Sequence, residues 1–284
     1  MWKLGVEVDR GRVAALPHPM DLPLTLPDPP AVPRPAASVL LLRDGPEGVE
    51  VFMATRHQGS SFMPGVLVFP GGGVDNADAD PKLVDAGAPE DWVSRIACLR
   101  EAFEEAGILL ARPSGDGNPV GASRLDGLLT AYRARLCSGE AAFSAMMDAE
   151  NLSAAIDLLV PYARWTTPIT RAKRFDVRFY LARAPEGQIG VHDDQELVDS
   201  RWITPARAFA ELDEGKIRLV FATRSHLRLL AKSRTVDEAL EAARTRPLPV
   251  VEPQLFMSPD GPALRVPSGI GYDVTEILLK DVGD

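Results

Sequence analysis

The sequence predicts an α/β fold, and three stretches carry that prediction. Residues 37–42 and 49–55 are apolar runs separated by the turn residues 44–48, a pattern typical of a β-hairpin. Residues 66–69 form a short apolar run that ends in three glycines, and residues 98–108 place carboxylates and apolar residues at helical spacing. We expect further strands at 174–182 and 198–203, and a helix at 219–230 that completes the layers.

Length and composition indicate a globular chain with a real core. The 284 residues are 45% hydrophobic and 25% charged, with a net charge of −9. This acidity disfavours binding to a nucleic-acid backbone, and no apolar run is long enough for a membrane helix. Cys98 and Cys137 form no disulfide framework, which fits a reducing cytoplasm. We therefore expect a cytoplasmic protein with neither a nucleic acid nor a membrane as partner.

The chain divides into an arm, one domain and an extension. Residues 1–35 are rich in proline, which disfavours helices and predicts an extended arm, with a proline-rich recognition ligand as the alternative. We place the domain at 36–232, with insertions at about 76–90 and 112–163, and the extension that packs on it at 233–284. The remaining predicted helices are 125–136, 143–149, 153–162, 205–212 and 235–244, and short strands are predicted at 264–266 and 271–274.

Three glutamates mark the candidate site. Glu101, Glu104 and Glu105 are spaced so that a helix places them on one face. Like charges on one face repel each other unless a cation collects them, and Mg²⁺ prefers oxygen ligands. Arg100 lies beside the cluster and could brace one carboxylate. The alternative is an ordinary solvated acidic face, but the strand and glycine turn at 66–73 add backbone oxygens near the same point.

These residues resemble the signature of the Nudix hydrolases. That signature reads Gly-x5-Glu-x7-Arg-Glu-U-x-Glu-Glu-x-Gly-U, where U is apolar. Residues 100–108 match its second half, and Phe69-Pro-Gly-Gly72 resembles the strand and turn that precede it. Arg100 follows Gly72 by 28 positions, twice the family's separation, so about 14 residues are inserted. Counting back from Arg100, the first glutamate of the signature falls on Trp92, with Glu90 and Asp91 beside it.

The resemblance implies an αβα sandwich with a mixed sheet, a helical insertion and a C-terminal extension. It also implies that Glu101, Glu104, Glu105 and the carbonyl of Gly71 hold Mg²⁺ or Mn²⁺, with Gly72 at the substrate and Arg100 orienting a ligand carboxylate. A base takes the proton of the attacking water. Besides the glutamates of the signature, Glu196 is our candidate, with Asp193 and Asp194 as rivals and a solvated loop as the alternative.

A second resemblance concerns the substrate. Upstream of the glycines, Arg56 and Gly65 match a signature of Nudix enzymes that act on coenzyme A, while His57 and Ser61 depart from it. The interrupted signature also resembles that of the peroxisomal-type acyl-coenzyme A diphosphatases. Arg174 belongs to a local basic cluster that would contact phosphates, or would be a solvated strand edge. The insertion at 112–163 is either a structural elaboration or a cap over an acyl-pantetheine tail.

The implied activity is metal-dependent hydrolysis of a nucleoside diphosphate linked to another group, a small-molecule substrate. Coenzyme A or acyl-CoA is the leading candidate and would yield 3′,5′-ADP and (acyl-)4′-phosphopantetheine. One alternative is an ADP-ribose or dinucleotide pyrophosphatase. Another is a Nudix domain that senses a nucleotide without hydrolysing it. A homodimer is left open.

Overall fold

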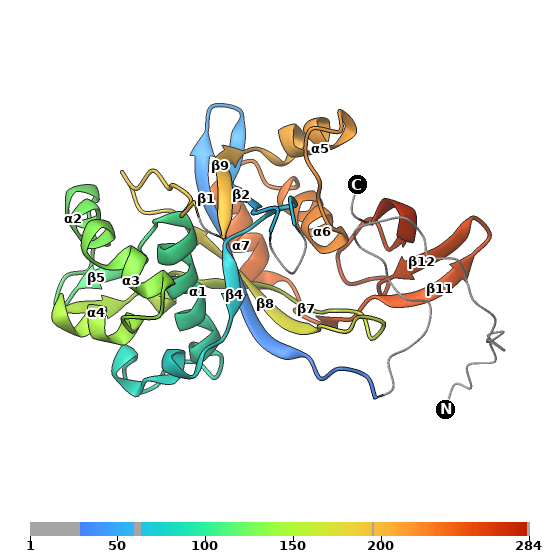
Figure 1. Ribbon diagram of the computed structural model, residues 1–284. Helices are drawn as coiled ribbons and strands as arrows, with labels where there is room; N and C mark the ends of the chain where they lie inside the picture. Colours follow the sequence, from blue (N-terminus) through green and yellow to red (C-terminus); the bar gives the residue numbers. More distant parts are fainter. Residues whose placement is uncertain (1–28, 60–63, 195, 283–284) are drawn as a thin grey trace.

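The computed structural model describes residues 29–59, 64–194 and 196–282. Residues 1–28 of the predicted arm and Ser61 lie outside these ranges. At the centre of the molecule is a mixed eight-stranded sheet with the order β10-β7-β8-β1-β2-β3, in which β4 also pairs with β1 and β9 with β2 (Figure 1). Strands β1 and β8 run parallel, whereas β1–β2 and β7–β8 are antiparallel. The sheet strands are β1 (Arg34–Gly45), β2 (Gly48–Arg56), β3 (Leu67–Val68), β4 (Gly71–Gly73), β7 (Val160–Thr166), β8 (Phe175–Arg183), β9 (Leu197–Ile203) and β10 (Val250–Val251).

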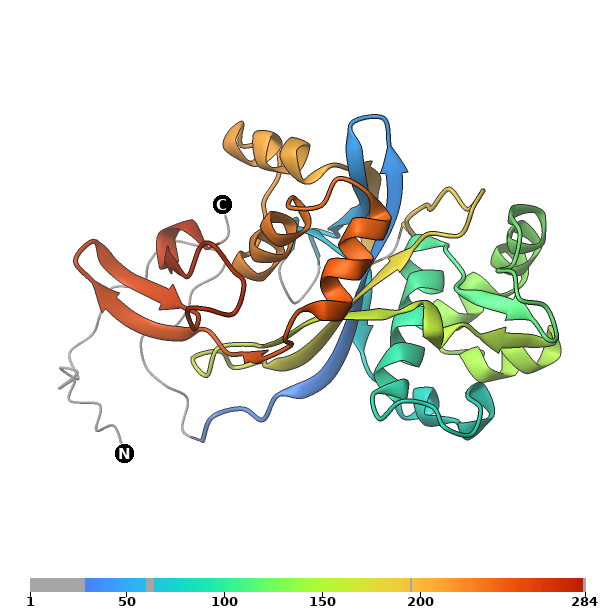
Figure 2. The same ribbon diagram turned by 180° about the vertical axis from the view of Figure 1, so that it is seen from behind.

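Strand β1 explains why the sheet is covered on both faces. Side chains alternate between the two faces of a strand, and β1 is apolar on both. Val39 and Leu41 belong to the hydrophobic cluster under α1 (Trp92–Ala106), and Leu40 and Leu42 belong to the opposite cluster. Helices α6 (Phe221–Leu230) and α7 (Val236–Thr245) pack in that second cluster, as the rear view shows (Figure 2). The predicted αβα sandwich is confirmed.

The first insertion and the helical insertion both pack beside α1. The chain makes two 3₁₀ turns at Asn76–Ala79 and Pro81–Leu83 before α1 begins. After α1, the predicted helix 125–136 is found as α2 (Ala122–Leu128), one π-helical turn (Leu129–Arg133) and α3 (Ala134–Cys137). The predicted helix 143–149 is α4 (Phe143–Ala149).

The predicted helix at 153–162 is wrong. Leu152–Ala154 form β6, which pairs with β5 (Ala111–Pro113), and after a 3₁₀ turn the chain enters β7 at Val160. Pro161 explains the difference, because a proline lacks the amide that a helix needs and favours an extended residue before it. Ile156, Leu158 and Leu159 pack in the cluster next to α1, whereas Val160 belongs to the opposite cluster.

The C-terminal segment packs against the second cluster. Helix α5 (Pro205–Asp213) is capped by Thr204, and α6 and α7 match their predictions closely. Beyond them, a separate antiparallel sheet contains β11 (Gln254–Ser258), β12 (Gly261–Arg265) and β13 (Glu276–Leu278). The strand predicted at 271–274 is wrong: Gly271 has φ 95°, which interrupts an extended run, and the strand follows at 276. No helix in the described ranges is long and apolar enough to span a bilayer.

Candidate active site

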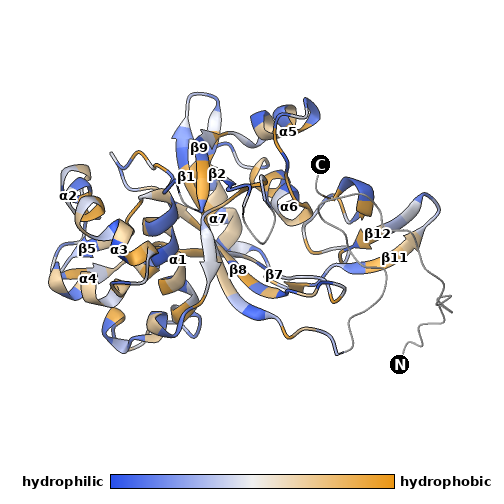
Figure 3. Ribbon diagram, viewed as in Figure 1, coloured by the Kyte–Doolittle hydropathy of each residue, from blue (hydrophilic) through white to orange (hydrophobic). Residues whose placement is uncertain are grey.

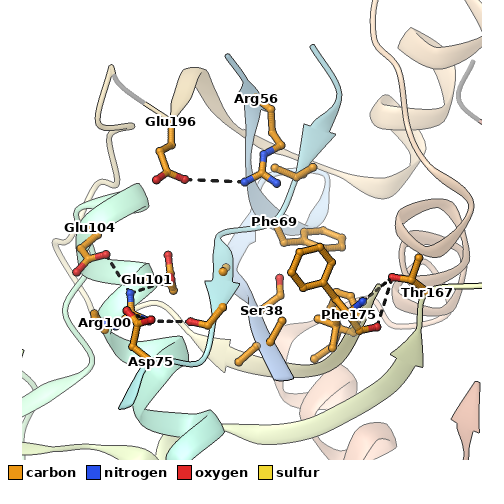
Figure 4. Close-up of a pocket in the computed structure, with 18 of the residues that line it drawn as sticks. Ser38, Arg56, Phe69, Asp75, Arg100, Glu101, Glu104, Thr167, Phe175 and Glu196 are labelled. Atoms are coloured by element: carbon orange, nitrogen blue, oxygen red, sulfur yellow. Dashed lines mark hydrogen bonds and ion pairs between the residues drawn. The ribbon is translucent and has the colours of Figure 1, made fainter. Parts of the chain in front are cut away.

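A large cleft lies beside β4 and passes from α1 to the C-terminal segment. Its volume is about 1110 Å³. Figure 4 shows Glu101, Glu104 and Arg100 on one side of β4, and Phe69 and Phe175 on the other. The hydropathy colouring shows that α1 carries both hydrophobic and hydrophilic residues (Figure 3). It therefore packs on the sheet while offering polar groups to the cleft.

Arg100 organises the acidic side of the cleft. Its guanidinium is buried, and its Nη1 donates to Glu101 Oε1 at 2.8 Å and to Glu104 Oε2 at 3.2 Å. Its Nη2 donates to the carbonyl of Gly73 at 2.9 Å, which ties α1 to β4. The planar guanidinium offers several donors in a fixed geometry, so a single side chain can orient both carboxylates. The predicted bracing role of Arg100 therefore has a geometric basis.

Asp78 is the residue that sequence reasoning missed. It is 1% exposed, and its carboxylate accepts from Arg100 Nε at 2.8 Å and Nη2 at 3.0 Å. Counting back from Arg100 had pointed to Trp92, whose neighbour Asp91 instead binds Arg95 and Tyr180. Counting forward six positions from Gly72, the separation in the family signature, leads to Asp78. The insertion therefore follows the first acidic position, where an aspartate replaces the glutamate.

Glu101 lies against the glycine turn. A Cβ atom on Gly72 would stand 2.3 Å from Glu101 Oε1, so only glycine permits this approach. Burial raises the pKa of Glu101 to about 7, although the charge of Arg100 opposes the rise. Burial likewise raises the pKa of Glu104, again opposed by Arg100. Both carboxyl groups are therefore poorly compensated anions in the absence of a further cation.

Glu105 is the most buried of the three glutamates. It is 4% exposed, and its Oε2 accepts a hydrogen bond from the amide of Gly71 at 2.7 Å. Burial, and then the charge of Glu101, raise the pKa of Glu105 well above its usual value. A Cβ on Gly71 would approach the carbonyl of Ala37 to 2.4 Å, so this turn also requires glycine. Strand β4 thus holds its backbone directly against the acidic face of α1.

The donor set fits a hard divalent cation. Carboxylate and carbonyl oxygens are the ligands that Mg²⁺ and Mn²⁺ take, and the raised pKa values mark carboxylates that a cation would stabilise. Within residues 29–59, 64–194 and 196–282, no three acidic, histidine or cysteine side chains are already gathered as a metal site. Glu101 and Glu104 instead face Arg100, and Glu105 faces Gly71. Metal binding would therefore require these side chains to reorient.

Glu196 lines the cleft, whereas its two rivals do not. Asp193 accepts hydrogen bonds from the backbone amides of Glu196 and Leu197, so it shapes the loop. Asp194 pairs with His192 and is largely exposed. Glu196 Oε2 stands 3.9 Å from Arg56 Nη2 in the cleft (Figure 4).

Arg56 and Arg174, the two arginines proposed to contact substrate, have different environments. Arg56 lines the cleft, and its buried Nε has no hydrogen-bond partner among the described residues. Arg174 is buried elsewhere: it donates to the carbonyls of Thr167 and Ala31 and pairs with Glu252 at 2.5 Å. The structure therefore does not bring Arg174 to the cleft. Arg171, which lies three positions before Arg174 in the sequence, does line it.

The helical insertion braces α1 through Arg133. Its Nε donates to the carbonyl of Glu104 at 2.8 Å, and its Nη2 donates to the carbonyl of Val191 at 2.6 Å. A cation suits the C-terminal end of a helix, where carbonyls lack partners. Arg133 thus links the acidic helix to the loop that precedes Glu196. No motif in the sequence signals this contact, because it joins segments that are distant along the chain.

A mixed sheet between helices, with a glycine strand against an acidic helix, defines a Nudix hydrolase fold. Comparison with known proteins agrees. The model of the NUDT19 Nudix domain matches residues 79–223, about half of the chain, and the chain belongs to this family within the Nudix hydrolases. A crystal structure of a Nudix hydrolase from Alicyclobacillus acidocaldarius is similar, with a TM-score of 0.64 and 27% identity over 74% of this chain and 96% of that one.

Two relatives illustrate the range of similarity. A Caenorhabditis elegans protein named nudix hydrolase 7 is 32% identical over 188 residues, which cover 66% of this chain and 56% of that protein. The human acyl-coenzyme A diphosphatase NUDT19 is 27% identical over an alignment of 284 residues, which covers 83% of this chain and 74% of the human protein. The chain thus spans little more than half of the worm protein.

Proposed function

We propose that this protein hydrolyses the diphosphate of coenzyme A or acyl-CoA with Mg²⁺ or Mn²⁺, yielding 3′,5′-ADP and (acyl-)4′-phosphopantetheine. The observation that carries the proposal is the set of three glutamates, two of them buried and one half-buried, which Arg100 and β4 orient at one side of a large cleft. The name of the human relative supports coenzyme A as the substrate class.

Each residue of the acidic side has a role in this proposal. Glu101, Glu104 and Glu105, with the carbonyl of Gly71, would hold the cation. When bound, it neutralises phosphate charge and lowers the pKa of a water. Arg100, held by Asp78, would position the side chains of Glu101 and Glu104 beside the cation.

Glu196 and Arg56 would serve proton transfer and phosphate binding, and both line the cleft with the glutamates. Glu196 lines the cleft on the loop that Arg133 braces, and it would accept the proton of the attacking water; a glutamate of α1 is the alternative base. Arg56 has an unpaired buried donor that a phosphate oxygen would satisfy. Gly72 lines the cleft and would contact the substrate through its backbone.

The cleft volume agrees with a substrate of this size. Ligand pockets for drug-sized molecules range over roughly 300–1,000 Å³, and this cleft reaches about 1110 Å³. A cytoplasmic location and the oligomeric state, including a homodimer, stay predictions.

The test is a substrate panel with product identification by mass spectrometry. The purified protein is incubated with CoA, acyl-CoA, ADP-ribose, NADH and oxidised dNTPs, each with Mg²⁺, with Mn²⁺ and with EDTA. We expect 3′,5′-ADP from CoA or its thioesters, at a kcat/KM above those for the other compounds, and no product with EDTA. Equal weak activity on all compounds would contradict the coenzyme A assignment. Hydrolysis of none would support a nucleotide sensor.

A further inference from the structure

The cleft continues beyond the acidic side into an apolar half. Strand β3, Phe69 and β4 lead from one to the other, because Phe69 lies two positions before the glycine whose amide binds Glu105. The residues that define the apolar half are Phe69, Trp165, Phe179, Phe221, Leu264 and Val282, and Thr166, Thr167 and Arg171 line the same cleft. A ligand held at the carboxylates can therefore extend along the same cleft to these apolar side chains.

The C-terminal segment closes the end of this apolar half. Leu264 on β12 and Val282 line the cleft and belong to the second hydrophobic cluster. Trp165 of β7 contacts both α6 and the C-terminal segment. Its ring packs edge-on against that of Phe221, with 5.8 Å between the ring centroids, and its Nε1 donates to Tyr272 Oη at 2.9 Å. The end wall is therefore built on packed elements and not on a loose tail.

We propose that the apolar half of the cleft holds the acyl chain of the thioester, and that the C-terminal wall of Leu264 and Val282 sets the preferred chain length. This inference rests on the proposed function, since it assigns a part of the same substrate. It places the acyl chain at the C-terminal segment, away from the helical insertion. The insertion lines the other end of the cleft with a mixed set of side chains, in which Ser138 and Glu140 stand beside Leu136, Ala141 and Phe143.

An acyl chain fits this surface better than the adenine ring does. Adenine has an amino group and ring nitrogens, and burying them without hydrogen-bond partners is costly. A methylene chain has no such groups, and each buried methylene strengthens binding by about fourfold. We therefore expect KM to fall as the chain lengthens, until the chain reaches Leu264 and Val282.

The chain offers a matched pair of variants for the test. Ala222 on α6 and Ala141 before α4 are both half-buried residues that line the cleft, in the apolar half and on the insertion side respectively. Ala222→Trp and Ala141→Trp add the same volume on opposite walls. Val282→Ala enlarges the end of the apolar half. Circular dichroism and thermal melting show whether each variant is folded.

The measurement is kcat/KM for CoA and for its acetyl, octanoyl, dodecanoyl and hexadecanoyl thioesters, below their micellar concentrations. We expect Ala222→Trp to lower the ratio of dodecanoyl-CoA to CoA by at least tenfold, and Ala141→Trp to leave that ratio within twofold. Val282→Ala should shift the optimum to a longer chain. If the ratio of kcat/KM for dodecanoyl-CoA to that for CoA is equal in all variants, or falls only in Ala141→Trp, the inference is overturned.

A binding experiment separates this inference from the proposed function. S-dodecanoyl-pantetheine carries the acyl arm without a diphosphate, and calorimetry measures its binding without turnover. Saturable binding to the wild type that Ala222→Trp weakens supports the acyl site, even if the substrate panel shows no hydrolysis. Hydrolysis of CoA thioesters without such binding, or with binding unchanged in Ala222→Trp, overturns the acyl site and leaves the proposed function standing.

Discussion

The two halves of the cleft use burial in opposite ways. In the acidic half, burial raises the pKa of Glu101 to about 7 and that of Glu105 well above its usual value, so the anionic forms are costly. Beside the apolar half, His226 is fully buried among aromatic rings, and burial lowers its pKa to about 3, so the cationic form is costly. One half is built to receive a cation, and the other presents mainly aromatic and aliphatic side chains. The same desolvation thus indicates a reactive centre in one place and an apolar binding surface in the other.

Removing a carboxylate of the acidic half should have the largest effect. We expect Glu104→Gln and Glu105→Gln each to lower kcat by about a hundredfold or more, because a bound cation supplies several kcal/mol of transition-state stabilisation. Steady-state kinetics at saturating Mg²⁺ measure the change, and circular dichroism checks the fold. Full activity in both variants would contradict the role of this helix.

Loss of Asp78 should produce a smaller effect of the same kind. Asp78→Asn leaves Arg100 free to turn away from Glu101 and Glu104, and outer partners of this type contribute about 10- to 100-fold in metal affinity or activity. The readout is the Mg²⁺ concentration at half-maximal activity, which should rise, and Asp78→Glu should restore most of it. Asp85→Asn, at an exposed position of the inserted loop that follows Asp78, is the control. If Asp78→Asn changes only the stability and leaves the Mg²⁺ dependence unaltered, Asp78 supports the fold and does not position the metal-binding glutamates.

His226 offers a test of the apolar half through pH. Its folded pKa of about 3 lies below its usual value of 6.5, so below pH 6.5 the unfolded chain binds a proton that the folded protein excludes. Stability therefore falls as pH drops from 6.5 toward 3. We expect His226→Phe to reduce this loss, measured as the difference in Tm between pH 7 and pH 5. A wild type and variant with parallel pH profiles would show that His226 does not contribute.

Arg174 should affect stability and not substrate binding. Its guanidinium joins Ala31, Thr167 and Glu252, so Arg174→Met leaves partly buried acceptors without this donor and should cost about 1 kcal/mol. Urea unfolding measures this loss, and KM for CoA should stay within about twofold of the wild type. Arg171→Met, on the cleft wall, is the comparison in which KM should rise. A large rise in KM for Arg174→Met would contradict this assignment and indicate that Arg174 contacts the substrate.

The sequence predicted the acidic half much better than the apolar half, for physical reasons. Carboxylates at spacings of three and four on one helix are a local pattern, so Glu101, Glu104 and Glu105 could be grouped without a structure. Asp78 was missed because the inserted loop separates it from Arg100 along the chain, although the two side chains are hydrogen-bonded in the folded protein. The apolar half is assembled from β7, β8, α6 and the C-terminal segment, whose side chains resemble ordinary core residues in the sequence. Similarly, the segment 153–162 has helical spacing, but Pro161 and pairing with β5 make it extended.

The most direct test of the central claim is calorimetric titration of Mn²⁺ into the protein at pH 7, in two buffers that differ in ionisation enthalpy. If the buried glutamates hold the cation, binding saturates and releases protons, because the folded pKa of Glu101 is about 7. Glu104→Gln should then bind Mn²⁺ at least about tenfold more weakly than the wild type. No saturable binding, or equal affinity in the wild type and Glu104→Gln, would contradict the account.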